Sequence, residues 1–335
     1  MEPEVSDDRL TFEEHLITLG IAAAGDRRYP GLASGGSMMR RSGGRMFGEC
    51  HAHIIMDGKN YKAAVSLHRD GVKDGPIREH FEAWQQAGVT FVRDGGDALG
   101  VSARAREIAP EYGIDYRSPI FAIHKKGHYG GIVGHAFRDR QEYRELVQRA
   151  RREGADFIKI MISGLMEFDR FGVLNEEGLS AEEIREMIEF AHDRGMKVMA
   201  HGNGDGPARA AVEAGLDTLE HGDYLEQDTL DMLAESHTIW VPTLAPTGNL
   251  LGCGRYPDEQ VEQILRRQMR CVRYVFEKGG RLGLGSDAGA YLVPHGQGLL
   301  DEYAWMKQAV GPENVPELDR RLEESEEWIK KEMKR

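Results

Sequence analysis

The chain has 335 residues, which is too long for a small module and fits either one large α/β barrel or two ordinary domains. Its 43 lysine and arginine residues stand against 56 aspartate and glutamate residues, giving a net charge of −13. This balance argues against nucleic acid or an anionic membrane as the main partner. No apolar run approaches the roughly 20 residues that cross a bilayer, so we expect no membrane partner either.

The first four residues, Met-Glu-Pro-Glu, lack the basic start and apolar stretch of a secretory signal, which predicts a cytoplasmic protein. The cysteines Cys50, Cys253 and Cys271 show neither the paired spacing of a metal finger nor a disulfide framework. We expect all three to be reduced.

Residues 1–45 predict one amphipathic helix, 11–24, and a Gly/Ser/Arg-rich connector, 31–44. From residue 46 onward, short apolar runs alternate with helical stretches, a pattern typical of parallel βαβ units. Eight runs suffice to close a barrel, so the sequence predicts an α/β fold, a distorted (β/α)8 TIM barrel. The runs are residues 46–50, 89–93, 116–122, 157–162, 197–200, 218–219, 238–244 and 281–285. The helical stretches between them are 77–87, 103–112, 140–152, 180–194, 206–214, 227–234 and 258–278.

Helix boundaries carry clear signals. Most of the predicted helices end at a glycine, such as Gly88 or Gly279, and Ser180 with Glu183 forms a capping box. Helical stretch 299–310 and a charged helix, 315–335, follow the eighth run; the charged helix is expected to be a solvated outer cap. We expect an N-terminal extension (1–45), a barrel (46–310) and a capping helix (311–335), in a chain that forms a homo-oligomer.

Barrel enzymes place their chemistry at the C-terminal ends of their strands. Several predicted strands here end in residues that bind metals, and the fourth strand contains a lysine among apolar residues. These residues are His51 and His53 after the first strand, Lys159 within the fourth, His201 and His221 after the fifth and sixth, and Asp287 after the eighth.

Imidazole ligands suit zinc first, with manganese, iron and cobalt as alternatives. Six ligands exceed the three or four of one zinc site, so we expect two divalent ions. Lys159 would be a costly buried cation. If its amine reacts with carbon dioxide, it becomes a carbamate anion whose two oxygens can bridge the two ions.

This ordered set resembles the metal centre of the amidohydrolase superfamily, in the subtype with a carboxylated bridging lysine, over about residues 46–300. Lys159 favours the dipeptidase-like side of the prolidase-like and imidazolonepropionase-related branch. The family's accessory β-sandwich is expected to be absent or reduced, because few residues precede the first histidine pair and the C-terminal stretch reads as a helix. The local stretches that resemble this branch are 220–225, 241–244, 285–289 and 295–296, with Glu302 downstream.

The resemblance implies that His51, His53 and Asp287 hold one ion, that His201 and His221 hold the other, and that carbamylated Lys159 bridges them. It also implies attack on an amide by a hydroxide that bridges the ions, with Asp287 as general base and acid. The expected substrate is a small molecule such as a dipeptide, an N-acyl amino acid or a cyclic amide.

Four further residues are expected at the substrate. His128 matches a substrate-contacting histidine of similar enzymes, and Tyr224 is placed to bond the oxyanion or a substrate carboxylate, so both are predicted catalytic and binding residues. Arg170 and His295 are predicted binding residues. The alternatives are packing of a loop for His128, Tyr224 and His295, and a surface ion pair for Arg170.

Two rival functions stay open. The same centre suits a lactonase, a phosphotriesterase or a deaminase, which differ from an amidohydrolase in the leaving group. From a different class, the barrel could be a non-catalytic metal-binding scaffold. Asp287 speaks against the scaffold, because a structural site needs no proton shuttle.

Overall fold

The structure is a computed structural model, and its described residues are 47–335; the predicted helix 11–24 and connector 31–44 lie outside them. All strand pairs are parallel. The strands are β1 (Glu49–Ala52), β2 (Phe91–Asp94), β3 (Asp115–Arg117), β4 (Ala122–Lys125), β5 (Gly134–Phe137), β6 (Ile158–Met161), β7 (Val198–Gly202), β8 (Thr218–His221) and β9 (Ile239–Val241).

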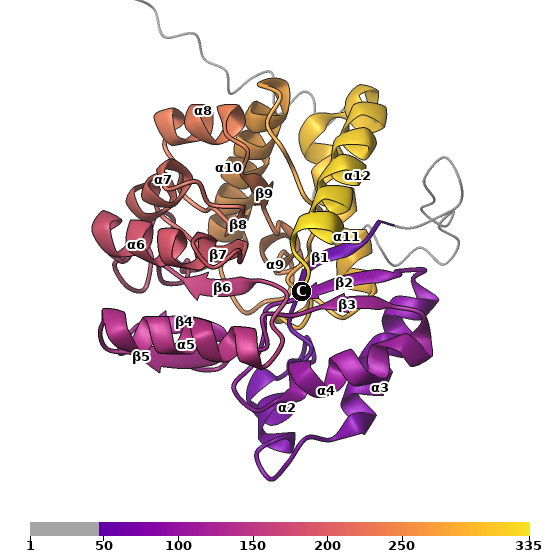
Figure 1. The fold of residues 1–335 in the computed structure, drawn as a ribbon. Helices are drawn as coiled ribbons and strands as arrows, with labels where there is room; N and C mark the ends of the chain where they lie inside the picture. The colour runs from indigo at the N-terminus through magenta and orange to yellow at the C-terminus, as the bar shows by residue number, and fades with distance from the viewer. Residues whose placement is uncertain (1–46) are drawn as a thin grey trace, which may run out of the picture. The chain divides into compact units, whose positions relative to one another are not determined.

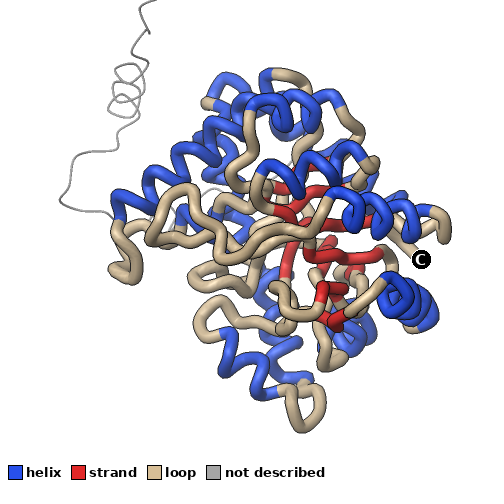
Figure 2. The backbone as a smooth tube through the Cα atoms, turned by 90° about the vertical axis from the view of Figure 1, so that its left-hand side faces the viewer, coloured by secondary structure: helices blue, strands red, loops and turns tan. Residues whose placement is uncertain are grey.

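The strands form one sheet in the order β1-β2-β3 and a second in the order β5-β4-β6-β7-β8-β9. Residues 281–288, which include the eighth predicted strand, connect the outer strands β9 and β1. The Trp240 amide donates to the Arg281 carbonyl at 2.9 Å, and the Cys50 amide donates to the Leu284 carbonyl at 2.9 Å. The predicted TIM-barrel fold is confirmed, with the strands in the interior and helices around them (Figures 1 and 2).

Two details of the strand prediction were wrong. The single predicted strand 116–122 is divided: β3 pairs with β2, and β4 pairs with β6. Strand β5, which pairs with β4 outside the ring of predicted strands, was missed because it is only four residues long and contains Gly134 and a half-buried His135. Every strand between residues 47 and 335 belongs to these two sheets.

The predicted helices are present with small shifts at their ends, and the capping box of Ser180 and Glu183 forms as expected. Two short helices, α2 and α9, were not predicted. Gly88 and Gly279, just after α3 and α10, have φ angles of 79° and 89°, which a glycine adopts without strain. The helices are α2 (Tyr61–Leu67), α3 (Asp74–Gln86), α4 (Val101–Ile108), α5 (Arg140–Arg152), α6 (Ala181–His192), α7 (Asp205–Glu213), α8 (Gln227–Glu235), α9 (Ala245–Gly248), α10 (Asp258–Glu277), α11 (Gln297–Val310) and α12 (Val315–Glu332).

Helix α12 is more than a solvated cap. Its Glu326 carboxylate accepts a hydrogen bond from the Gly48 amide at 2.8 Å, just before β1. Ile329 and, after the helix, Met333 are fully buried in a cluster with inward-facing barrel residues. The helix, which lies beside β1 in Figure 1, therefore closes the N-terminal end of the barrel, and its charged residues other than Glu326 are exposed or half-buried. The other members of the cluster are Cys50, Phe91, Phe157, Met199, Ile239 and Val241.

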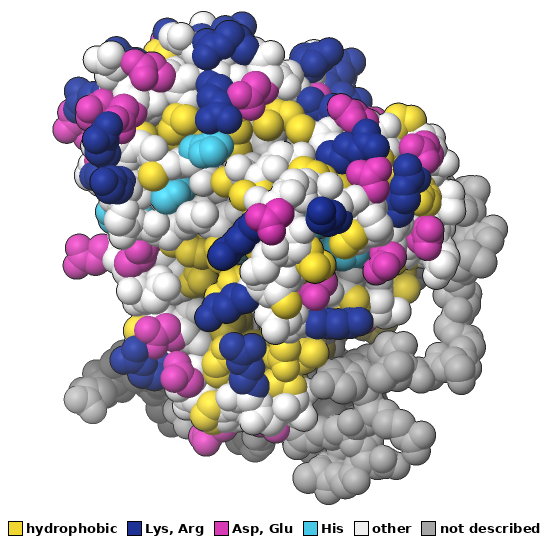
Figure 3. All heavy atoms as spheres, turned by 90° about the horizontal axis from the view of Figure 1, so that it is seen from below, with side chains coloured by type: hydrophobic (Ala, Val, Ile, Leu, Met, Phe, Trp, Pro, Cys, Tyr) yellow, Lys and Arg dark blue, Asp and Glu magenta, His cyan; other side chains and the backbone are white. Residues whose placement is uncertain are grey.

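The surface mixes both signs of charge. On the face in Figure 3, lysine and arginine side chains are interspersed with aspartate and glutamate side chains around gathered hydrophobic groups. None of the helices within residues 47–335 has the length and apolar character to cross a bilayer.

Candidate metal centre

Three predicted ligands meet at the C-terminal end of β1. The Nε2 atoms of His51 and His53 lie 3.4 Å apart, and Asp287 Oδ1 lies 3.6 Å and 3.3 Å from them. Gly95 lets the β2 loop approach this group, because a Cβ at that position would lie 2.3 Å from the His53 ring. Two imidazole nitrogens and a carboxylate oxygen thus face one point, an arrangement that suits a divalent ion.

A buried ion pair orients His51. The Glu220 carboxylate accepts from His51 Nδ1 at 2.7 Å through one oxygen and from Arg93 at 2.9 Å through the other. All three side chains are fully buried. Because Nδ1 carries the proton that Glu220 accepts, Nε2 presents its lone pair toward His53 and Asp287, as a ligand nitrogen must.

His201 and His221 continue the cluster from β7 and β8. Their ring centroids lie 4.6 Å apart, and the His221 ring lies 5.1 Å from that of His51. His201 Nε2 is hydrogen-bonded to the Gly164 carbonyl at 3.0 Å, and His221 Nδ1 to the Thr243 hydroxyl at 2.7 Å. Each histidine therefore keeps one ring nitrogen free to bind an ion.

Lys159 lies in the middle of β6 with its amine buried and without a hydrogen-bond partner among the described residues. Burial lowers the pKa of this amine to about 8. About a tenth of this amine is therefore uncharged at pH 7, far more than for an ordinary lysine, and a lysine must be uncharged to react with carbon dioxide. A buried amine without a partner is costly unless another group binds it.

All four histidines are neutral. Burial first, and then the charge of Lys159, lowers the pKa of His53 and of His201 to about 3. Burial also lowers the pKa values of His51 and His221 well below that of a free imidazole. Neutral imidazoles have the lone pairs that metal binding requires.

Left-handed backbone turns some of these side chains inward. Strict alternation along β8 would point Glu220 and His221 to opposite sides, yet both reach the barrel interior because His221 has a φ of 68°. Asp287 has a φ of 59°, and Thr243 one of 49°. Non-glycine residues in this region carry strain, which is typical of functional sites.

The Asp287 carboxyl is poised to exchange a proton. Burial raises its pKa to about 7, while the charge of Lys159 opposes the shift and those of Glu49 and Glu220 add to it. Its backbone amide is fixed by the His51 carbonyl at 2.8 Å. A carboxyl with a pKa near neutrality is suited to general acid and base chemistry.

Two of the predicted substrate residues lie in the loops after β4 and β6. The His128 side chain is one-third exposed and its Nδ1 lies 3.7 Å from Glu176. Arg170 is 63% exposed and pairs with Glu167 of its own loop. The structure does not bring Arg170 into the histidine cluster, and substrate binding by either residue stays a prediction.

The other two are buried. Tyr224, after β8, has its hydroxyl buried without a partner among the described residues, and its ring packs against Phe171. His295 stacks on His80 of α3 at 3.8 Å between ring centroids and meets Trp84 edge-on. His295 thus packs against α3 beside the predicted ligand His53, and its substrate role stays a prediction.

Sequence reasoning missed the residues that orient the ligands. Thr243 and Arg93 gave no motif signal, because each acts through a contact with a strand that is distant in the sequence. Tyr129 was also missed, although its ring lies 5.1 Å from that of His201. Its position beside His128 in a loop with three nearby glycines was the only signal available.

Comparison with known proteins identifies relatives of this chain. The chain is 31% identical to an uncharacterized protein of Mycobacterium tuberculosis over 135 residues, 38% of this chain and 36% of that protein. It is 27% identical to ochratoxinase of Aspergillus niger over 154 residues, 44% of this chain and 32% of that enzyme. The matched stretches thus span about a third of the length of these curated relatives.

Solved structures show the same fold. A Xaa-Pro dipeptidase with methionine bound in its active site superposes with a TM-score of 0.62 at 20% identity, over 83% of this chain and 75% of that one. Aspergillus niger ochratoxinase superposes with a TM-score of 0.59 at 20% identity, over 79% and 71%. The sequence profile of the Amidohydrolase family matches residues 50–314, most of the chain and all of the predicted ligands. The chain belongs to the Amidohydrolase family.

Proposed function

We propose that the protein is a metal-dependent amidohydrolase that cleaves the C–N bond of a small amide such as a dipeptide, an N-acyl amino acid or a cyclic amide. The observation that carries this proposal is the convergence of His51, His53 and Asp287, whose ligand atoms lie within 4.8 Å of one another. Membership of the family, and the likeness to a dipeptidase and to ochratoxinase, favour an amide over the other bonds such centres cleave.

The donor set fits divalent transition ions. The four neutral histidines each offer one nitrogen, and the buried Lys159 amine has no partner among the described residues. Reaction of this amine with carbon dioxide forms a carbamate and releases one proton, which replaces an unpaired buried amine by an anion that two cations can share. This chemistry explains why a lysine is tolerated inside an apolar strand.

In this proposal, His51, His53 and Asp287 would hold one ion, His201 and His221 would hold the other, and carbamylated Lys159 would serve as a ligand of both. Zinc is the first expectation, with manganese, iron and cobalt as alternatives. When bound, such ions act as Lewis acids and bring the pKa of water toward neutrality.

Asp287 carries the proton. It accepts a proton from the attacking water and delivers it to the nitrogen of the leaving group, so that the C–N bond breaks and the products are a carboxylate and an amine. Its pKa near 7 suits both steps. Glu220 and Thr243 keep the rings of His51 and His221 in place during turnover. His128, Tyr224, Arg170 and His295 remain candidates for binding the rest of the substrate.

The test combines elemental analysis of the purified protein with assays on dipeptides and N-acyl amino acids, repeated after chelation and after readdition of zinc. We expect two ions per chain, turnover of at least one amide class, and loss and recovery of turnover with the metal. Lys159→Ala should release bound metal, whereas Lys125→Ala, which alters a surface ion pair with Glu183, should leave it in place.

Each alternative has its own signature. Turnover of lactones or phosphotriesters in place of amides would reassign the substrate class. Bound metal without turnover of any substrate class would favour the scaffold, and two ions retained by Lys159→Ala would contradict the carbamate.

A further inference from the structure

Tyr129 lies in the loop between β4 and β5 and is held from two sides. Its backbone amide donates to the Glu176 carboxylate, which belongs to the loop after β6, at 2.7 Å. Its ring packs against a small buried cluster that includes Val133 and Met161. On its other side, the ring lies 5.1 Å from that of His201, inclined by 49°. These contacts fix the ring beside a predicted metal ligand.

The hydroxyl of Tyr129 is not used for structure. It makes no hydrogen bond within residues 47–335. A phenol keeps its proton at neutral pH, and burial raises the pKa of this one further. Tyr129 therefore offers a free O–H donor on a ring that packs beside His201.

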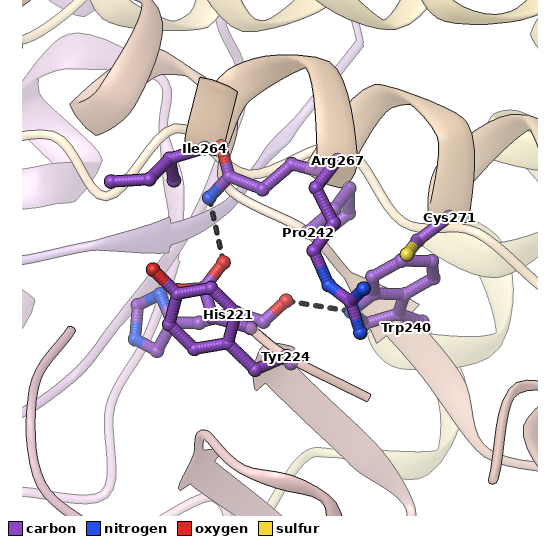
Figure 4. Close-up of a pocket in the computed structure, with 10 residues that line it drawn as sticks. His221, Tyr224, Trp240, Pro242, Ile264, Arg267 and Cys271 are labelled. Atoms are coloured by element: carbon purple, nitrogen blue, oxygen red, sulfur yellow. Dashed lines mark hydrogen bonds between the residues drawn. The ribbon is translucent and has the colours of Figure 1, made fainter. Parts of the chain in front are cut away.

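Tyr224, the tyrosine that the sequence favoured for this position, is arranged differently. It lines a small cavity of about 10 Å³, room for about one water, next to His221 and against α10 (Figure 4). Its hydroxyl is buried there, and the Phe171 ring covers its side chain. Arg267 and Gln268 of α10 line the same cavity, so the Tyr224 hydroxyl lies within the wall of the barrel.

We propose that Tyr129 donates a hydrogen bond from its hydroxyl to the scissile carbonyl oxygen of the substrate, and holds this oxygen as it becomes the oxyanion of the tetrahedral intermediate. This inference rests on the proposed amide hydrolysis and adds a catalytic residue to it. The phenol keeps its proton throughout, so no group is transferred. A neutral donor fixed in advance by packing stabilises charge that develops only in the transition state.

The experiment compares Tyr129→Phe with Tyr274→Phe, a matched variant that also removes a single hydroxyl, one that bonds Asp231 between the outer helices α10 and α8. Removal of one oxyanion donor lowers kcat by about 100-fold or more. We expect such a loss for Tyr129→Phe with little change in KM, and a change of less than about threefold for Tyr274→Phe. Phenylalanine keeps the ring that packs on His201, so bound metal and the unfolding midpoint should match those of the parent. A kcat of Tyr129→Phe within about threefold of the parent, or an equal loss in Tyr274→Phe, would overturn the inference.

A binding measurement separates this inference from the proposed reaction. The probe is a phosphonamidate of an amino acid, whose tetrahedral phosphorus oxygens imitate the oxyanion, titrated calorimetrically into the protein as purified. Tyr129→Phe should bind it about 100-fold more weakly than the parent, and Tyr274→Phe should bind it as tightly as the parent. If the parent cleaves no amide and Tyr129→Phe still binds the probe about 100-fold more weakly than the parent, the Tyr129 donor is retained and the proposed reaction is refuted. Equal affinity of the parent and Tyr129→Phe, or no binding to the parent, would overturn the inference.

Discussion

The two ends of the barrel differ in whether their buried charged groups have hydrogen-bond partners. At the N-terminal end, Arg93 donates hydrogen bonds to Glu220 and Thr218. Glu326 accepts hydrogen bonds from Gly48 and Lys330. The apolar cluster around Ile329 and Met333, called here the α12 plug, covers this end. At the C-terminal end, the Lys159 amine has no partner within residues 47–335. A fold tolerates unpaired buried groups only where something else binds them or where strain serves a function. The contrast assigns stability to one end and chemistry to the other.

The largest effect is expected from Asp287→Asn at the C-terminal end of the barrel. The amide can still face the ions but cannot carry the proton, so we expect kcat to fall by about 1,000-fold or more while bound metal is retained. Steady-state assays with elemental analysis measure both. Asp231→Asn, which alters a surface contact on α8, serves as the control and should retain activity. Turnover within tenfold of the parent would remove Asp287 from the mechanism.

At the other end, Ile329→Ala should act on stability alone. Ile329 is fully buried in the α12 plug, and truncation of such a side chain costs about 2–5 kcal/mol of unfolding free energy. Denaturant unfolding measures the loss, and Glu327→Ala on the exposed face of the same helix should change stability by less than about 0.5 kcal/mol. If the kcat of folded Ile329→Ala also fell by tenfold, the two ends would not be separable.

A variant of Glu302 should have the smallest effect per measured step, and it tests whether a buried group without a full set of partners makes the unfolding free energy depend on pH. It is a buried carboxyl of α11 that accepts from the Ala245 amide through one oxygen and has no partner for the other among the described residues. Burial raises its pKa from 4.5 to about 8, so the folded protein keeps a proton that the unfolded chain releases. The stability it contributes is complete below pH 4.5 and is lost as the pH rises toward 8.

Glu302→Gln should abolish this dependence. Between pH 5.5 and 7.5 the parent should lose up to about 1.4 kcal/mol of unfolding free energy per pH unit more than the variant, as urea titrations at several pH values would show. Unchanged kcat in the variant would identify Glu302 as a structural acid. Parallel pH profiles of stability would contradict the raised pKa.

Much of this molecule could be read from the sequence because the relevant signals are local. Apolar runs and terminal glycines gave the barrel strands and helices, and ligand residues at strand ends gave the cluster around His51 and Asp287. The missed features depend on distant partners. Strand β5 exists because β4 offers it an edge, and Thr243 matters because His221 lies across from it. Alternation also cannot anticipate the left-handed φ of His221.

One carboxylate, that of Glu220, belongs to both ends at once. One of its oxygens neutralises Arg93, whose guanidinium also contacts Met333 of the apolar plug, and the other orients His51. Replacement of Glu220 by a neutral residue would leave the Arg93 guanidinium without a counter-charge in the interior, and it would remove the acceptor that fixes the tautomer of His51. In the proposed metal centre, metal affinity and thermal stability would therefore be coupled through a single side chain, and changes near the barrel axis that alter one property are expected to alter the other.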